Sequence, residues 1–466
     1  MGPGVCFIMA RMKKSFPLLL LLCSSAAFAS STLDIGTNYR LRGISMTKTD
    51  YGLSTGQDYA YYSQRAQAHI GGRFSPNIEF MTQLQAIGVA GSSTTTNPIV
   101  NPGGNRYPNT SFTPWIQTAY MKANQLYDMP VDITIGRQPI TLGDGFILSD
   151  DDLGFTGIRL QSRLPWYDLQ AQAFTFKVAD SMIGSNDTDV YGVELTKPTR
   201  NIRYQASMVT ERDASGTTIY IRPSENPTTL AGSNLTASRI TRTFYDGRIE
   251  GRLLEGGFYK AELALQSGTV ERSSATLGTV NLGGYAFLIS AGLFTRFSKY
   301  GPIEIHSLFG IASGDSGSGR DNSFRPSFGH KYDGLERSGF GEFYGATLYD
   351  AIPSNTYGPS ASTSSVSGLP PGNSGLRVIG AGVTTHPTSL LSVGIDYFVY
   401  TAQESAGFSP ASSESSLGTE LDIGAGFAYT NYLTFRATFA LFSPGKAYGA
   451  FTNNAQRIGI EAVGRF

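Results

Sequence analysis

Charged side chains recur at even-numbered positions of one stretch of the chain, residues 240–253. They are Arg242, Asp246, Arg248, Glu250 and Arg252. Arginine carries a permanent charge and presents a planar fork of donors that matches a carboxylate. A row of such groups could therefore bind an anion at several weak, exchangeable positions in succession. The alternative is that each arginine pairs with an acid and only covers a wall.

Other stretches carry charged residues with the same two-residue alternation. These residues are Arg40, Arg42, Arg65, Arg137, Arg159, Glu304, Arg436, Arg457 and Glu461. At the middle of a membrane an arginine that faces lipid costs about 2–4 kcal/mol. If the strands cross a membrane, these side chains must therefore face inward, and the sequence predicts a wet, densely charged bore.

The remaining candidates for chemistry are weaker. Gly314-Asp315-Ser316-Gly317 copies a serine-protease signature, but a triad also needs a His and an Asp held close to the Ser. The histidines lack the spacing of metal ligands, so no metal or other cofactor is expected. Asp150-Asp151-Asp152 offers carboxylate oxygens that suit Ca²⁺. It lacks the spaced ligands of a calcium loop, and we expect a solvated acidic tip there.

Strands must hold these side chains, and residues 417–466 show the pattern best. Leu433, Phe435 and Phe439 alternate with polar or small residues, which is the two-residue period of a strand. The chain then stops inside a strand, at Phe466, and the partner available to it is the first strand. A sheet closed on itself has no edges and can stand in lipid. The predicted fold is an all-β, transmembrane antiparallel β-barrel.

The connections between the predicted strands alternate in length. Short turns rich in Pro, Gly and Asn alternate with long polar loops at residues 92–111, 213–238, 314–374 and 403–416. This is the layout of outer-membrane barrels, with short periplasmic turns and long extracellular loops. It gives about 18 strands. The 314–374 loop is the best candidate for an inward-folded constriction, because loops of this length are usually functional.

The first residues predict export. A basic start at Lys13, a leucine-rich run and Ala27-Phe28-Ala29 form a signal peptide over residues 1–29, with the true start possibly at Met12, followed by one barrel over residues 30–466. Both cysteines precede residue 30, so the mature chain has none. It keeps 33 basic and 36 acidic residues, a net charge of −3, and this balance argues against nucleic acid as a partner.

Three segments resemble the alginate export family of outer-membrane barrels. They are Ile135-Gly136-Arg137-Gln138 with Leu142-Gly143-Asp144-Gly145 and Phe155-Thr156-Gly157-Ile158-Arg159; Ala312-Ser313-Gly314-Asp315 with residues 324–332; and residues 417–422 with residues 441–446. The resemblance implies an 18-stranded monomeric porin that passes an anionic polysaccharide through an arginine-lined constriction. Arg137 and Arg159 occupy matching positions. The mixture of acids and arginines in this chain departs from that pattern and puts alginate itself in doubt.

The function predicted from these features is passive diffusion of a hydrophilic, anionic solute or glycan through the bacterial outer membrane, without catalysis. The lipid of the outer membrane and the solute are the expected partners. Two alternatives remain open. One is an outer-membrane barrel hydrolase, for which His306 or His330 would supply the histidine. The other is a structural barrel that sheathes an electron-transfer partner.

Overall fold

The computed structural model describes residues 32–49, 58–90, 107–108, 110–164, 167–180, 186–226, 229–230, 233–253, 255–274, 276–297, 301–349, 369–370, 372–406, 413–449 and 452–466. The predicted signal peptide and some residues of the predicted loops fall outside these ranges. Among the described residues, no helix has the length and apolar character needed to cross a membrane.

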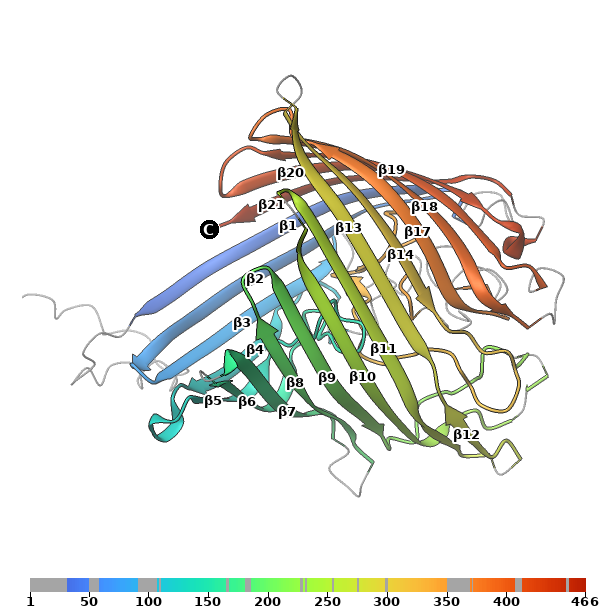
Figure 1. Cartoon of the computed structure of the whole chain (residues 1–466), viewed down its shortest axis with the longest axis horizontal. Coiled ribbons are helices and arrows are strands. Elements are labelled where there is room, and N and C mark those ends of the chain that lie inside the picture. Colours follow the sequence, from blue (N-terminus) through green and yellow to red (C-terminus); the bar gives the residue numbers. More distant parts are fainter. Residues whose placement is uncertain are drawn as a thin grey trace, which may run out of the picture.

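Eighteen antiparallel strands close into one barrel (Figure 1). They are β1 (Leu33–Thr47), β2 (Tyr59–Ser75), β3 (Ile78–Val89), β4 (Trp115–Ala123), β5 (Val131–Gln138), β6 (Phe155–Leu164), β7 (Leu169–Ala179), β8 (Thr188–Pro198), β9 (Ile202–Asp213), β10 (Ala237–Leu253), β11 (Gly257–Arg272), β13 (Tyr285–Phe297), β14 (Gly301–Ala312), β17 (Asn373–Thr385), β18 (Leu391–Ser405), β19 (Ser416–Ala428), β20 (Leu433–Pro444) and β21 (Ala455–Arg465). The short β12 (Thr279–Leu282) continues the outer end of β13 against β11. The predicted strand count is confirmed.

The barrel closes between its first and last strands. β1 pairs with β21 in a continuous register from Asn38↔Arg465 to Thr47↔Gln456. Beyond this register, the backbone N–H and carbonyl of Phe466 both bond to Thr37, at 2.9 and 2.7 Å. The chain therefore uses its final residue to complete the closure, as its alternation predicted.

Side chains divide between the two faces of the wall as their polarity requires. On β10, Arg242 and Asp246 are 9% and 7% exposed, whereas Tyr245 and Leu253 on the other face are 50% and 54% exposed. An outward apolar face is stable only in lipid, because in water a patch of this size would drive association. The alternation thus directs the charges of the strands into the lumen.

Turn lengths follow the prediction as well. Connections are short at the end of the barrel where β1 begins and β21 ends. For example, two residues join β2 to β3 and three join β8 to β9. The long connections lie at the opposite end, and the longest joins β14 to β17. Within it, β15 (Tyr332–Asp333) and β16 (Glu336–Arg337) form a small separate hairpin.

Apolar side chains of two loops fill part of the barrel interior, so charged groups share the lumen with a hydrophobic cluster. Loop residues including Leu142, Leu148, Phe324 and Tyr344 are buried against inward-facing wall residues such as Phe244. Each fully buried side chain of this size contributes about 1.5–3 kcal/mol. The loops are therefore held inside the barrel by the same effect that builds the core of a globular protein.

Candidate functional site

The first loop that enters the lumen joins β5 to β6, residues 139–154. Ile140, Leu142, Ile147 and Leu148 are at most 4% exposed, so its fold is fixed by an apolar core. At its tip, the carboxylate of Asp144 faces the opposite wall. It lies 2.9 Å from Arg248 Nη2 and 2.5 Å from Lys260 Nζ, both inward-facing.

Glycine permits this close approach at the loop tip. Gly143 has φ +54°, and a Cβ there would lie 2.6 Å from Glu262 Oε1 on β11. The Asp144 N–H donates to the other Glu262 oxygen at 3.0 Å. At the loop base, Arg137 Nε donates to the carbonyls of Leu153 and Gln117, at 2.8 and 3.1 Å. The loop is thus fastened at both ends.

The second inward loop joins β14 to β17 and is described over residues 313–349, 369–370 and 372. Its apolar residues Phe324, Phe343 and Leu348 are at most 2% exposed. The carboxylate of Asp315, at the start of the loop, accepts hydrogen bonds from Arg222 Nη2 at 2.7 Å and from the Ser224 hydroxyl at 2.6 Å. The expected inward fold of the 314–374 segment is therefore observed over its described part.

Five arginines of the barrel wall face this second loop, and we name them the arginine wall: Arg40 and Arg42 on β1, Arg65 on β2, Arg436 on β20 and Arg457 on β21. Asp333 of the loop hairpin lies 2.6 Å from Arg40, 3.2 Å from Arg42 and 3.2 Å from Arg65. Burial would raise the pKa of Asp333, but these guanidinium groups lower it well below its ordinary value.

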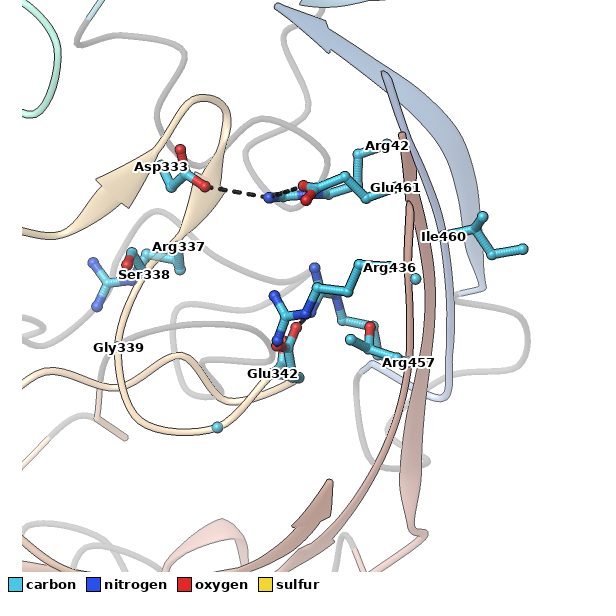
Figure 2. A pocket seen from close by; sticks show the side chains of 13 residues that line it. Arg42, Asp333, Arg337, Ser338, Gly339, Glu342, Arg436, Arg457, Ile460 and Glu461 are labelled. Carbon is cyan, nitrogen blue, oxygen red and sulfur yellow. Dashed lines mark hydrogen bonds and ion pairs between the residues drawn. The ribbon is translucent and has the colours of Figure 1, made fainter. Parts of the chain in front are cut away.

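The other two members of the arginine wall hold Glu342. Arg457 Nη1 lies 2.5 Å from a Glu342 carboxylate oxygen and 2.6 Å from its backbone carbonyl, and Arg436 pairs with the other carboxylate oxygen. Burial raises the pKa of Glu342, yet Arg457 and Arg436 outweigh it and the net shift is downward. Figure 2 shows Arg436 and Arg457 on the strands opposite the loop that carries Glu342.

Between the loop and the arginine wall lies a small cavity of about 130 Å³. Its charged lining is Arg42, Arg337, Arg436, Arg457, Asp333, Glu342 and Glu461. Glu461 lies 2.5 Å from Arg42, so the wall supplies one carboxylate of its own. Positive and negative groups almost balance at this point while the loop is in place.

A larger cavity of about 740 Å³ extends from the β5–β6 loop to the periplasmic turns of the neighbouring strands, and we call it the vestibule. Five cations and two carboxylates line it: Lys122, Arg159, Arg163, Arg203 and Arg248, with Asp132 and Glu194. The uncharged polar residues of the lining are five glutamines and three hydroxyl residues: Gln125, Gln161, Gln170, Gln172 and Gln205, with Thr141, Ser162 and Thr196. The cations of the lining thus outnumber its carboxylates by three, and acids outside the lining pair with Arg163, Arg203 and Arg248.

The family follows from the sequence as a whole. The family model described as alginate export matches residues 31–346, more than half of the chain. The chain belongs to the alginate export family. No curated protein matches the sequence.

Solved structures share the fold of this alginate export barrel. OccK8 (OprE) of Pseudomonas aeruginosa has a TM-score of 0.54 at 10% identity, covering 93% of this chain and 98% of its own. A BenF-like porin of Pseudomonas fluorescens Pf-5 has a TM-score of 0.52 at 11% identity. The match covers 93% of this chain and 99% of that porin. The protein is an outer-membrane channel of the porin type.

The predicted site residues of the alginate export barrel fall into separate groups instead of one row. Arg40, Arg42, Arg65, Arg436, Arg457 and Glu461 surround the β14–β17 loop; Arg242, Asp246, Arg248 and Glu250 lie together on β10; Arg159 lines the vestibule. Glu304 lies beside His306, at 3.8 Å, and Arg252 is exposed near the short turn after β10. Their roles in transport stay predictions.

Two backbone carbonyls hold the Arg137 side chain at the loop base, outside the lining of the small cavity and of the vestibule, and its role in transport stays a prediction. One expectation needs correction. The acidic tip is not solvated: Asp150 and Asp151 are 6% and 3% exposed. Asp150 accepts the Gly154 N–H at 2.9 Å, and burial raises its pKa to about 6.

Sequence reasoning missed the loop carboxylates that balance the arginines. Asp144, Asp333, Glu336 and Glu342 were not among the predicted site residues. The available signal was apolar residues without strand periodicity inside loops, such as Ile147-Leu148 and Phe343-Tyr344. Apolar clusters in an extracellular loop must be buried somewhere, and the lumen is the space that can take them.

Proposed function

We propose that this channel carries hydrophilic, anionic solutes across the outer membrane by passive diffusion. The observation that supports it best is the vestibule, where five cations face two carboxylates. A low-dielectric cleft lined by one sign of charge concentrates counter-ions and raises their rate of entry. Solute then moves down its gradient, and the transport step itself needs no catalysis.

The cations of the vestibule are suited to weak and exchangeable binding. Arg203 is half exposed, and its partner Glu250 lies at 3.6 Å, a loose pair. Arg159 donates to the neutral Gln172 at 2.8 Å, so its charge is not cancelled by that bond. Conduction requires sites that attract an ion but also release it, and these two arginines meet both conditions.

The solute class follows from the donors. Guanidinium groups bind carboxylates in two-point fashion, so solutes that bear carboxylates fit this lining better than neutral sugars. We propose that an acidic glycan or its fragments belong to this class and that the barrel acts as a monomer. The sheath hypothesis is disfavoured, because the two inward loops of the chain itself occupy the lumen.

Reversal potentials in planar bilayers under a KCl gradient test the proposal. The unaltered channel should prefer chloride, and the double variant Arg159→Gln/Arg203→Gln should lose much of that preference. A matched control is Arg239→Gln, which removes one positive charge from an exposed pair with Glu271 away from the vestibule lining. A cation preference in the unaltered channel, or an equal effect of the control, would overturn the proposal.

A further inference from the structure

Three side chains from the two inward loops lie in an order that supports acyl transfer. His330 Nδ1 is 2.6 Å from Asp151 Oδ1, and His330 Nε2 is 3.1 Å from Ser338 Oγ. Asp151 comes from the β5–β6 loop, and the other two come from the β14–β17 loop. A carboxylate at Nδ1 and a hydroxyl at Nε2 are the contacts that activate a serine nucleophile.

Several hydrogen bonds hold the Asp151 carboxylate in a fixed position. Asp151 is 3% exposed, and it also accepts the Lys331 N–H at 3.1 Å and the Ser149 hydroxyl at 3.2 Å. A fixed carboxylate holds the proton of the imidazole on Nδ1, which leaves Nε2 free to accept a proton from a hydroxyl. The hydrogen bond to Asp151 raises the pKa of His330 despite its partial burial.

The serine is held in reach of the histidine by the hairpin around it. The Ser338 N–H donates to the Lys331 carbonyl at 2.8 Å, across β15 and β16. Ser338 and the exposed Gly339 also line the 130 Å³ cavity, opposite the arginine wall (Figure 2). His330 lines a second cavity of about 290 Å³, so the three residues lie between two spaces that solute can enter.

We propose that Ser338, His330 and Asp151 form a hydrolytic triad that cleaves short acyl esters of hydrophilic solutes inside the lumen. This activity is separate from the proposed diffusion of anions. It would make the channel an enzyme for esters that reach its constriction.

The reaction balances with water as co-reactant. His330 Nε2 takes the proton of Ser338 Oγ, which attacks the ester carbonyl; the intermediate collapses, and the leaving alcohol takes that proton from His330. Water then attacks the acyl-serine while His330 Nε2 takes a proton from it; as the acyl–oxygen bond breaks, His330 gives that proton to Ser338 Oγ, and the acid product leaves with Ser338 and His330 restored. The Gly339 N–H, next to the nucleophile in the chain, is the candidate donor to the oxyanion.

The cavities decide the class of ester. The 130 Å³ cavity has room for about four water molecules, which suits a short acyl group. Apart from Ile460, both cavities are lined by charged, polar or glycine residues. A long acyl chain would meet no apolar side chain other than Ile460 there, so short esters of polar molecules are favoured over lipids as substrates.

The test uses the purified barrel in detergent, with p-nitrophenyl acetate and p-nitrophenyl palmitate as probes. We expect hydrolysis of the acetate and not of the palmitate, with a rate that rises with pH through a pKa above the usual 6.5 of histidine. Ser338→Ala and His330→Gln should lower the rate about 100-fold or more. A fluorophosphonate probe should label Ser338, as located by peptide mass spectrometry.

Control variants distinguish a hydrolytic triad from hydrogen bonds that only join the two loops. Ser316→Ala changes the serine of the protease-like signature, and His306→Gln changes a lumen histidine that pairs with Asp396 at 2.6 Å; both should keep full activity. Ser338→Ala deletes one oxygen, and heat-modifiable migration on gels checks that it folds. Absence of hydrolysis, label on another residue, or full activity in Ser338→Ala would each overturn the proposal.

Discussion

Replacing Glu342 with glutamine removes the charge that holds the β14–β17 loop to Arg457 and Arg436. The Arg457 side chain is 10% exposed, and a hydrogen bond to a charged partner in such a place contributes about 1.5–3 kcal/mol. The Arg436 side chain is 52% exposed, so its pair contributes about 0.2–1 kcal/mol. Together the change should weaken loop docking by about 2–4 kcal/mol.

That free energy corresponds to a measurable shift in the equilibrium between the docked and the released state of the loop. Every 1.4 kcal/mol is tenfold, so Glu342→Gln should favour the released loop by about 30- to 700-fold. In single-channel recordings we expect more frequent and longer high-conductance events. Because one negative charge also leaves the constriction, the reversal potential should move toward the equilibrium potential of chloride.

A matched control is Glu271→Gln, which alters an exposed pair with Arg239 at 3.7 Å, away from the lining of both cavities. Exposed pairs of this kind contribute at most about 1 kcal/mol, and the loop is not involved. Its recordings should match those of the unaltered channel. Unchanged gating and selectivity in Glu342→Gln would refute the view that this carboxylate fastens the loop.

Two further predictions concern the same loops. Asp333 and Glu342 have lowered pKa values, so their contribution is present near neutral pH and is lost progressively as the pH falls below their ordinary pKa values toward the lowered ones; conductance events like those of Glu342→Gln should appear in that acidic range and reverse on return to pH 7. The raised pKa of Asp150, about 6, has the opposite sign, and its contribution fades as the pH rises past 6. Phe324→Ala should weaken loop docking by about 3–5 kcal/mol, seen as faster proteolysis of the loop while heat-modifiable migration stays unchanged.

The barrel could be predicted from the sequence because its rules are local. Two-residue alternation fixes which side chain faces lipid, and the energy of a charge in lipid leaves little choice for Arg242 or Arg457. Turn residues such as Pro76-Asn77 mark the short connections. The closure through Phe466 follows because an open edge is not tolerated in a membrane.

The lumen could not be predicted to the same depth, because its order depends on contacts between residues far apart in sequence. Asp333 meets Arg40 across 293 positions, and nothing near either residue indicates the pairing. Asp151 and His330 are 179 positions apart. The acidic run of residues 150–152 is expected to be solvated unless its burial is known. Each of these contacts depends on two loops folding inward together.

The loop carboxylates link conductance to selectivity in this channel. With the β14–β17 loop docked, the five members of the arginine wall face Asp333, Glu336 and Glu342 from the loop and Glu461 from β21. If the loop leaves, three of those four carboxylates leave with it, and the five arginines remain against Glu461 and against Asp152 of the β5–β6 loop, which lies 2.8 Å from Arg65. The same movement that widens the passage therefore makes it more positive. An anion would be favoured most strongly in the state that conducts best, and a cation would be opposed in that same state.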